Sequence, residues 1–177
     1  MTITVCELND QNIRDLNSCD GAFTVDSQVV LQVENNVIRY VVISVPAFEK
    51  RYPIIEIDQT VFRADAASAL FFAHMDGQIA GQVILRKNWN QFAYVEEIVV
   101  DIKFRKGGVG RALVQRAIDW AKDKQLAGIM VETQDNNVGA CHFYERCGFK
   151  LRGFDECLYK GVNRDSEEIA LYWYLLF

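Results

Sequence analysis

A chain of 177 residues, half of them hydrophobic and 24% charged, has the size and composition of one soluble globular domain. Its net charge of −5 and its lack of a basic run argue against nucleic acid as a main partner. An acidic surface suits a cationic substrate, or serves solubility alone. No apolar run approaches the roughly 20 residues of a membrane span, and residues 1–7 do not resemble a signal peptide, so we expect a cytoplasmic protein without a membrane partner.

The first half of the chain predicts strands with irregular connections. In chain order we expect a strand over residues 2–8, a short helix ending at Asn17, and a hairpin of strands over 27–34 and 37–45. Asp10 is placed to cap the helix, and Asn35-Asn36 is a pair typical of hairpin turns. Residues 46–66 predict an irregular segment.

The second half gives sharper signals. We expect strands over 69–75, 78–86 and 92–100, a helix over 108–124, a strand over 129–133, a helix over 138–146, and strands over 149–159 and 169–176. Asp76-Gly77 predicts a turn, and Gly128 and Gly148 are expected to close the two helices. Antiparallel strands followed by a strand-helix-strand-helix unit predict a mixed α/β sheet in a single domain over 1–177.

Five cysteines, an odd number without a C-x-x-C pair, predict buried, reduced thiols rather than a disulfide framework. Only His74 and His142 could assist them as metal ligands, so we expect no metal site.

A basic, glycine-rich loop precedes the first predicted helix. It consists of Arg105, Lys106, Gly107, Gly108, Val109, Gly110 and Arg111. Glycines let a backbone approach a ligand closely, and a helix start offers free N–H groups and partial positive charge. The loop therefore predicts an anion site, most naturally for a phosphate, although a turn that merely begins the helix is the alternative. The spacings of the P-loop and of the dinucleotide fingerprint are absent.

Two motifs carry a family resemblance. Arg105-x-x-Gly108-x-Gly110 resembles the [QR]-x-x-G-x-[GA] motif of the GCN5-related N-acetyltransferases, the GNAT superfamily. Asn137-x-x-Ala140-x-x-x-Tyr144-x-x-x-Gly148-Phe149 is similar to a second run of that superfamily. The resemblance implies a GNAT fold, with a mixed, mostly antiparallel central sheet flanked by helices. It also implies acetyl-CoA as cosubstrate, bound by residues 68–177, and an acceptor side formed by residues 1–67.

The resemblance further implies individual roles. The backbone of Ile98, Val99 and Val100 would pair with the pantetheine arm and supply the N–H that polarises the thioester carbonyl. Asn137 would join the loop in binding the cosubstrate. Tyr144 matches the usual general acid, which protonates the departing thiolate; a core tyrosine is the alternative.

Two adjacent carboxylates, Glu96 and Glu97, interrupt the apolar strand just before this backbone. Neighbouring strand residues face opposite sides, so we expect one carboxylate on each face of the sheet. An amine is mostly ammonium at pH 7, and some base must take its proton. The resemblance puts acidic residues here: Glu96 is the first candidate for the base or water-holder, and Glu97 for attracting the substrate. Partly exposed carboxylates without a role are the alternative, and we expect no catalysis by His142 or Cys141.

Weaker matches narrow the resemblance to the streptothricin acetyltransferases, which acetylate an amine on the β-lysine part of that antibiotic and confer resistance. The matching pieces are Asp20-Gly21-x-Phe23-Thr24-x-Asp26, Trp89-Asn90, Val95-Glu96-Glu97-Ile98, Leu158-Tyr159-x-Gly161 and Ala170-Leu171-Tyr172. The carboxylates that could receive such a polycation are Asp20, Asp26, Glu56, Asp58, Glu96, Glu97 and Asp155. The alternatives are acetylation of a polyamine, an aminoglycoside or protein amines, or a coenzyme A-binding module without catalysis. A homodimer is left open.

Overall fold

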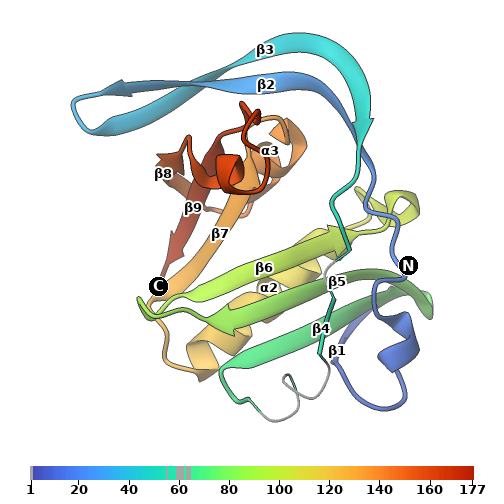
Figure 1. Ribbon diagram of the computed structural model, residues 1–177. Helices are drawn as coiled ribbons and strands as arrows, with labels where there is room; N and C mark the ends of the chain where they lie inside the picture. The colour runs from blue at the N-terminus through green and yellow to red at the C-terminus, as the bar shows by residue number, and fades with distance from the viewer. Residues whose placement is uncertain (1, 55, 59–61, 63–64) are drawn as a thin grey trace. The chain divides into compact units, whose positions relative to one another are not determined.

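The computed structural model describes residues 2–54, 56–58, 62 and 65–177 (Figure 1). The chain forms two compact units, the first of Met1–Phe23 and Arg51–Ile129 and the second of Thr24–Lys50 and Met130–Phe177. Within the described ranges, no helix is long and apolar enough to cross a membrane.

The first unit contains a run of antiparallel strands with one helix against it (Figure 1). The strands are, in spatial order, β1 (Ile3–Glu7), β4 (Ser68–Met75), β5 (Gln78–Lys87) and β6 (Ala93–Val100). Asp76 and Gly77 join β4 to β5 with φ of 50° and 83°, the left-handed conformations that match the twist of a two-residue hairpin. The predicted strands and turn are confirmed.

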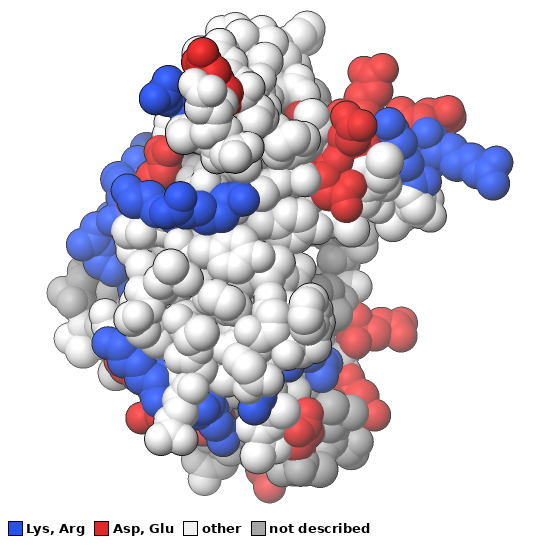
Figure 2. Space-filling view, turned by 90° about the vertical axis from the view of Figure 1, so that its left-hand side faces the viewer, with Lys and Arg blue, Asp and Glu red and all other residues white. Residues whose placement is uncertain are grey.

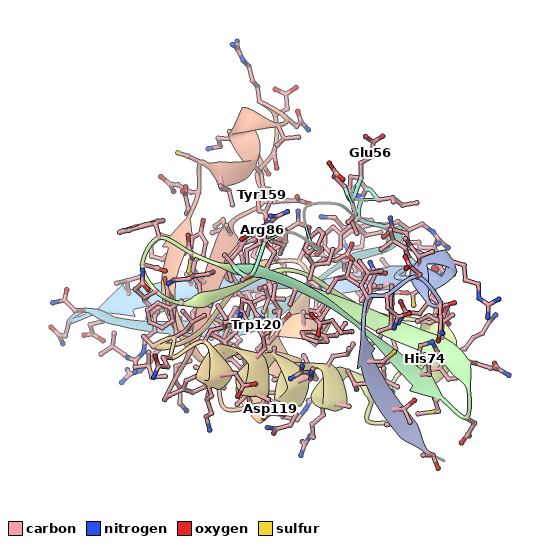
Figure 3. All side chains as sticks on the ribbon, turned by 90° about the horizontal axis from the view of Figure 1, so that it is seen from below. Glu56, His74, Arg86, Asp119, Trp120 and Tyr159 are labelled. Atoms are coloured by element: carbon pink, nitrogen blue, oxygen red, sulfur yellow. The ribbon has the colours of Figure 1, made fainter. Side chains whose placement is uncertain are left out.

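Helix α2 (Val109–Asp123) packs against these strands through an apolar stripe with helical spacing. Figure 3 shows Trp120 turned toward the strands and Asp119 turned away. The close approach depends on Gly81 of β5, because a Cβ there would lie 2.7 Å from the Val99 carbonyl oxygen and about 3 Å from the side chains of Val109 and Leu113. The start of α2 is thereby held against β5 and β6.

The second unit contains a long hairpin, three further strands and helix α3 (Figure 1). The strands are β2 (Phe23–Glu34), β3 (Val37–Lys50), β7 (Gly128–Gln134), β8 (Lys150–Asp155) and β9 (Ala170–Leu176), with β9 between β7 and β8. Asn35 and Asn36 form the predicted hairpin turn with φ of 51° and 61°. Fully buried Trp173 donates its indole N–H to Thr133 Oγ1 at 3.0 Å.

Helix α3 (Val138–Arg146) has the predicted bounds because both ends carry strong local signals. The Asn137 side chain caps the first turn by accepting the Ala140 N–H at 3.1 Å. Gly148 follows the helix with φ of 91°, a conformation that costs glycine little.

Other expected bounds were wrong. Residues 13–15 form only a 3₁₀ turn, whose preceding residue is Asn12 rather than a capping Asp10. Gln125, with φ of 56°, takes the left-handed conformation after α2 that we expected of Gly128, which instead begins β7.

Two segments also differ in extent. Pairing with β2 extends β3 to Lys50, well beyond the expected end at residue 45, and the expected irregular segment over 46–66 lies partly outside the described residues. The strand expected over 149–159 ends at Asp155, since the Asp155 side chain accepts the backbone N–H groups of Cys157 and Leu158 and turns the chain.

Candidate active site

The predicted phosphate loop connects β6 to α2 and leaves the helix start open. Lys106 and Gly108 adopt φ of 63° and 93°, and Gly108 precedes the helix without any side-chain cap on the first turn. The N–H groups of that turn have no partner within the helix, and they carry its partial positive charge. The exposed loop can therefore hold an anion, with Arg105, Lys106 and Arg111 as nearby cations.

The loop is fastened to its surroundings by close contacts. Arg105 Nε donates to the Val100 carbonyl oxygen at 3.2 Å, which ties the loop to the end of β6. A Cβ on Gly107 would lie 2.8 Å from the Met75 methyl carbon and 3.1 Å from the Phe104 carbonyl oxygen, so only glycine fits without a shift. Ile98, Val99 and Val100 form the end of β6, and a 3₁₀ turn over Ile102–Phe104 leads from there to the loop. On one side these three residues pair with Val83, Gln82 and Gly81 of β5.

The two glutamates of β6 lie at a β-bulge. Glu97 is opposite Ile84, but Val95 is opposite Leu85, so Glu96 is an extra residue in the pairing. Glu97 contacts Gln82 and Glu96 contacts Arg86, two side chains four residues apart that share a face of β5. The expectation of one carboxylate on each face was therefore wrong, because the bulge interrupts the alternation and brings both to one face.

Glu97 is partly buried and contacts a neutral side chain. Gln82, itself only 1% exposed, donates its amide to the Glu97 carboxylate and to Asn17 Oδ1, and it accepts the Asn17 backbone N–H. Burial raises the pKa of Glu97, and the hydrogen bond from Gln82 opposes this only in part. Gln82 and Asn17 were not predicted as site residues, although a glutamine in an apolar strand was a usable signal.

Glu96 has a different environment, since it pairs with Arg86 Nε at 2.5 Å. The Arg86 guanidinium lies 5.0 Å from the centre of the Phe62 ring, on the side of the strands opposite α2 (Figure 3). A hollow of about 160 Å³ opens there, lined by Glu56, Ile57, Asp58, Phe62, Ile84, Arg86 and Glu96. Three of the predicted acceptor carboxylates therefore meet in one place.

The remaining predicted carboxylates lie elsewhere. Asp20 accepts from Arg51 at 2.6 Å in the first unit, and its backbone N–H is held by buried Asp101 at 2.9 Å. Asp26 and Asp155 belong to the second unit. On the face drawn in Figure 2, acidic and basic side chains are interspersed with uncharged ones among the described residues.

The second predicted motif belongs to the second unit. Tyr144 is 3% exposed, and its ring centre lies 5.3 Å from those of both Phe143 and Phe149. Cys141 is fully buried, and burial raises the pKa of its thiol to about 11, so it is a poor nucleophile. His142 is exposed beside Glu145, as expected of a surface residue. The loop, Glu96, Glu97 and residues 98–100 are thus gathered on one strand and its following turn, while Asn137 and Tyr144 lie on α3 and its cap.

Comparison with known proteins identifies a family and several similar proteins. Residues 29–149 match the model of the acetyltransferase (GNAT) family. The chain is 34% identical to streptothricin acetyltransferase A of Bacillus subtilis (strain 168), over 98% of this chain and 99% of that protein. It is 43% identical to streptothricin acetyltransferase of Escherichia coli over 111 residues, 63% of this chain and 64% of that protein.

Solved structures extend these matches. One similar structure is that of a Bacillus anthracis str. Ames protein, assigned as a streptothricin acetyltransferase and bound to acetyl coenzyme A. It superposes with a TM-score of 0.93 at 41% identity, over 99% of this chain and 100% of that one. Nourseothricin acetyltransferase gives a TM-score of 0.83 at 29% identity, covering 99% of each chain.

Proposed function

This chain belongs to the acetyltransferase (GNAT) family, and we propose that it transfers the acetyl group of acetyl-CoA to an amine on the β-lysine part of streptothricin, conferring resistance to that antibiotic. The observation that carries the proposal is end-to-end similarity, in sequence to a streptothricin acetyltransferase and in structure to the acetyl-CoA complex of a protein so assigned. The acidic hollow beside β6 supports a cationic acceptor.

In this proposal the cosubstrate is bound by the β6–α2 connection. The open helix start and the loop cations hold the pyrophosphate, and the backbone of Ile98, Val99 and Val100 pairs with the pantetheine arm. A backbone N–H in that stretch polarises the thioester carbonyl. The asparagine cap of α3, Asn137, contributes to the same binding.

We assign the base to Glu97 rather than to Glu96, the first candidate on sequence grounds. A carboxylate with a raised pKa accepts a proton more readily, and Glu97 contacts a neutral amide instead of a cation. Glu96 is engaged by Arg86 and lines the hollow, so we assign it to shaping the acceptor site. Tyr144 then donates a proton to the departing thiolate, so that acetyl passes directly from sulfur to nitrogen.

The deciding experiment compares acceptors in parallel. Purified protein with acetyl-CoA is offered streptothricin, spermidine, an aminoglycoside and a lysine peptide, and acetylated product is measured by mass spectrometry. We expect kcat/KM to be far higher for streptothricin than for the others. Turnover of a polyamine with no reaction on streptothricin would refute the acceptor while leaving the acetyltransferase assignment intact.

A further inference from the structure

A cysteine, a histidine and an aspartate form a connected cluster in the first unit, apart from the residues assigned to acetyl transfer. Cys6 lies on β1, His74 on β4 and Asp15 in the 3₁₀ turn that follows β1 (His74 is labelled in Figure 3). His74 Nε2 is 2.9 Å from Asp15 Oδ2, and His74 Nδ1 is 3.8 Å from Cys6 Sγ. The order is thus thiol, imidazole, carboxylate.

The hydrogen bonding assigns a direction to this cluster. An ionised carboxylate only accepts, so the proton on the neutral imidazole belongs on Nε2, facing Asp15. The lone pair of Nδ1 then faces the Cys6 thiol and can take its proton. Asp15 stabilises the resulting imidazolium, which is the arrangement that activates a nucleophile through an adjacent, oriented base.

Asn12 completes the surroundings of the sulfur. Its side-chain amide, in a residue only 8% exposed, donates to Cys6 Sγ at 3.5 Å and to the Glu7 carbonyl oxygen at 2.8 Å. Its Oδ1 accepts the Asn9 N–H at 2.7 Å, so the amide orientation is fixed. A thiolate at Cys6 would therefore meet an N–H donor on one side and an imidazolium on the other.

Two other cysteines have surroundings that disfavour the thiolate. Burial and nearby Asp101 raise the pKa of the Cys19 thiol to about 11, and burial raises the pKa of the Cys141 thiol to about 11. Cys6 and Cys19 are both partly exposed, so exposure alone does not separate them. What distinguishes Cys6 is a base within reach of the thiol.

We propose that Cys6 is a site of thiol–disulfide exchange with low-molecular-weight disulfides. The Cys6 sulfur attacks one sulfur of the disulfide while His74 Nδ1 takes the thiol proton. The bond between the two original sulfurs breaks as the new one forms, and the leaving thiolate receives the proton from His74. The disulfide is the oxidant, one small thiol is released for each modified protein, and excess small thiol reverses the reaction.

The test uses the intact chain and 2-hydroxyethyl disulfide, an uncharged probe that nearby charges do not attract or repel. Time points at pH 7 are quenched with acid and modification at each cysteine is measured by peptide mass mapping. Cys157, which is exposed, serves as the internal reference. Cys6 has a base within reach of its thiol proton, and a nearby base assists attack by a nucleophile, so we expect Cys6 to react about tenfold faster than Cys157.

His74→Gln is the main variant and His142→Gln, on an exposed histidine, is its matched control. We expect His74→Gln to bring Cys6 down to about the rate of Cys157, and His142→Gln to change neither rate. Asp15→Asn keeps the side-chain shape but loses the charge, and it should also slow the reaction of Cys6. Unchanged labelling of exposed Cys157 and of buried Cys141 verifies that each variant is folded. Equal rates at Cys6 and Cys157 in the unaltered protein would overturn the proposal. So would a Cys6 rate unaffected by both His74→Gln and Asp15→Asn.

Discussion

Replacing Glu97 with glutamine is the sharpest test of the proposed chemistry. Glutamine has the same shape and can still accept from Gln82, so the variant removes little besides the ability to take a proton. A lost general base costs about 10²–10⁴-fold in rate, equivalent to about 3–5 kcal/mol of transition-state stabilisation. Since Arg86 holds Glu96 at 2.5 Å, that neighbour is a poor substitute, and we expect a loss of kcat within this range.

The pH dependence of Glu97→Gln carries an independent signature. Burial raises the pKa of Glu97, so the wild-type rate should rise with pH along an acid limb above the range of an ordinary glutamate, and the variant should lack that limb. Because the pKa of Glu97 is higher in the folded than in the unfolded protein, protonated Glu97 contributes to the free energy of unfolding at low pH. That contribution is lost as the pH rises through the folded-state pKa. At pH 7 the variant should therefore be at least as stable as the wild type.

The assay is steady-state kinetics with streptothricin and acetyl-CoA across pH, with Glu96→Gln as the control that removes the same charge one residue away. We expect Glu96→Gln mainly to raise KM for the acceptor. If Glu97→Gln keeps kcat within about threefold of wild type at every pH, the reasoning from burial to base is refuted. A large loss of kcat in Glu96→Gln alone would exchange the two roles.

Three other substitutions test separate parts of the molecule. Gly110→Glu should weaken acetyl-CoA binding, measured by calorimetry, because a carboxylate would project at the open helix start; Gly161→Glu, at an uncrowded position, should not. Tyr144→Phe should lower kcat by roughly 10–10⁴-fold with similar acetyl-CoA affinity, and full activity would mean that another group protonates the thiolate. Thr133→Val should lower the free energy of unfolding by about 1–3 kcal/mol in urea titrations, because it leaves the buried indole N–H of Trp173 without its hydrogen-bond acceptor.

The fold was predictable from sequence because its strongest signals are local. A capping asparagine and a left-handed glycine delimit α3, and the Asp76-Gly77 and Asn35-Asn36 pairs occupy the turns that their conformations favour. The GNAT fold implied by the two motifs is confirmed by the family match and by the structural similarity. The position of the loop before α2 was likewise predictable, and its role in binding an anion stays a prediction.

The arrangement around the glutamates was not predictable, because it depends on pairing between distant segments. Whether Glu96 and Glu97 share a face is decided by the bulge in the β5–β6 register, and nothing in the local strand pattern encodes it. The contact between Asn17 and Gln82 joins residues 65 positions apart. The contact of Arg86 with Glu96, on which the two proposed roles depend, also becomes visible only once β5 and β6 are paired.

The short stretch from Asp15 to Asn17 touches both chemical clusters of the first unit. Asp15 orients His74, and Asn17, with φ of 55°, holds the glutamine that contacts Glu97. Shortening the N-terminus through this stretch would thus remove the contact that positions Gln82 beside the proposed base, although Asn17 itself is assigned no role in acetyl transfer.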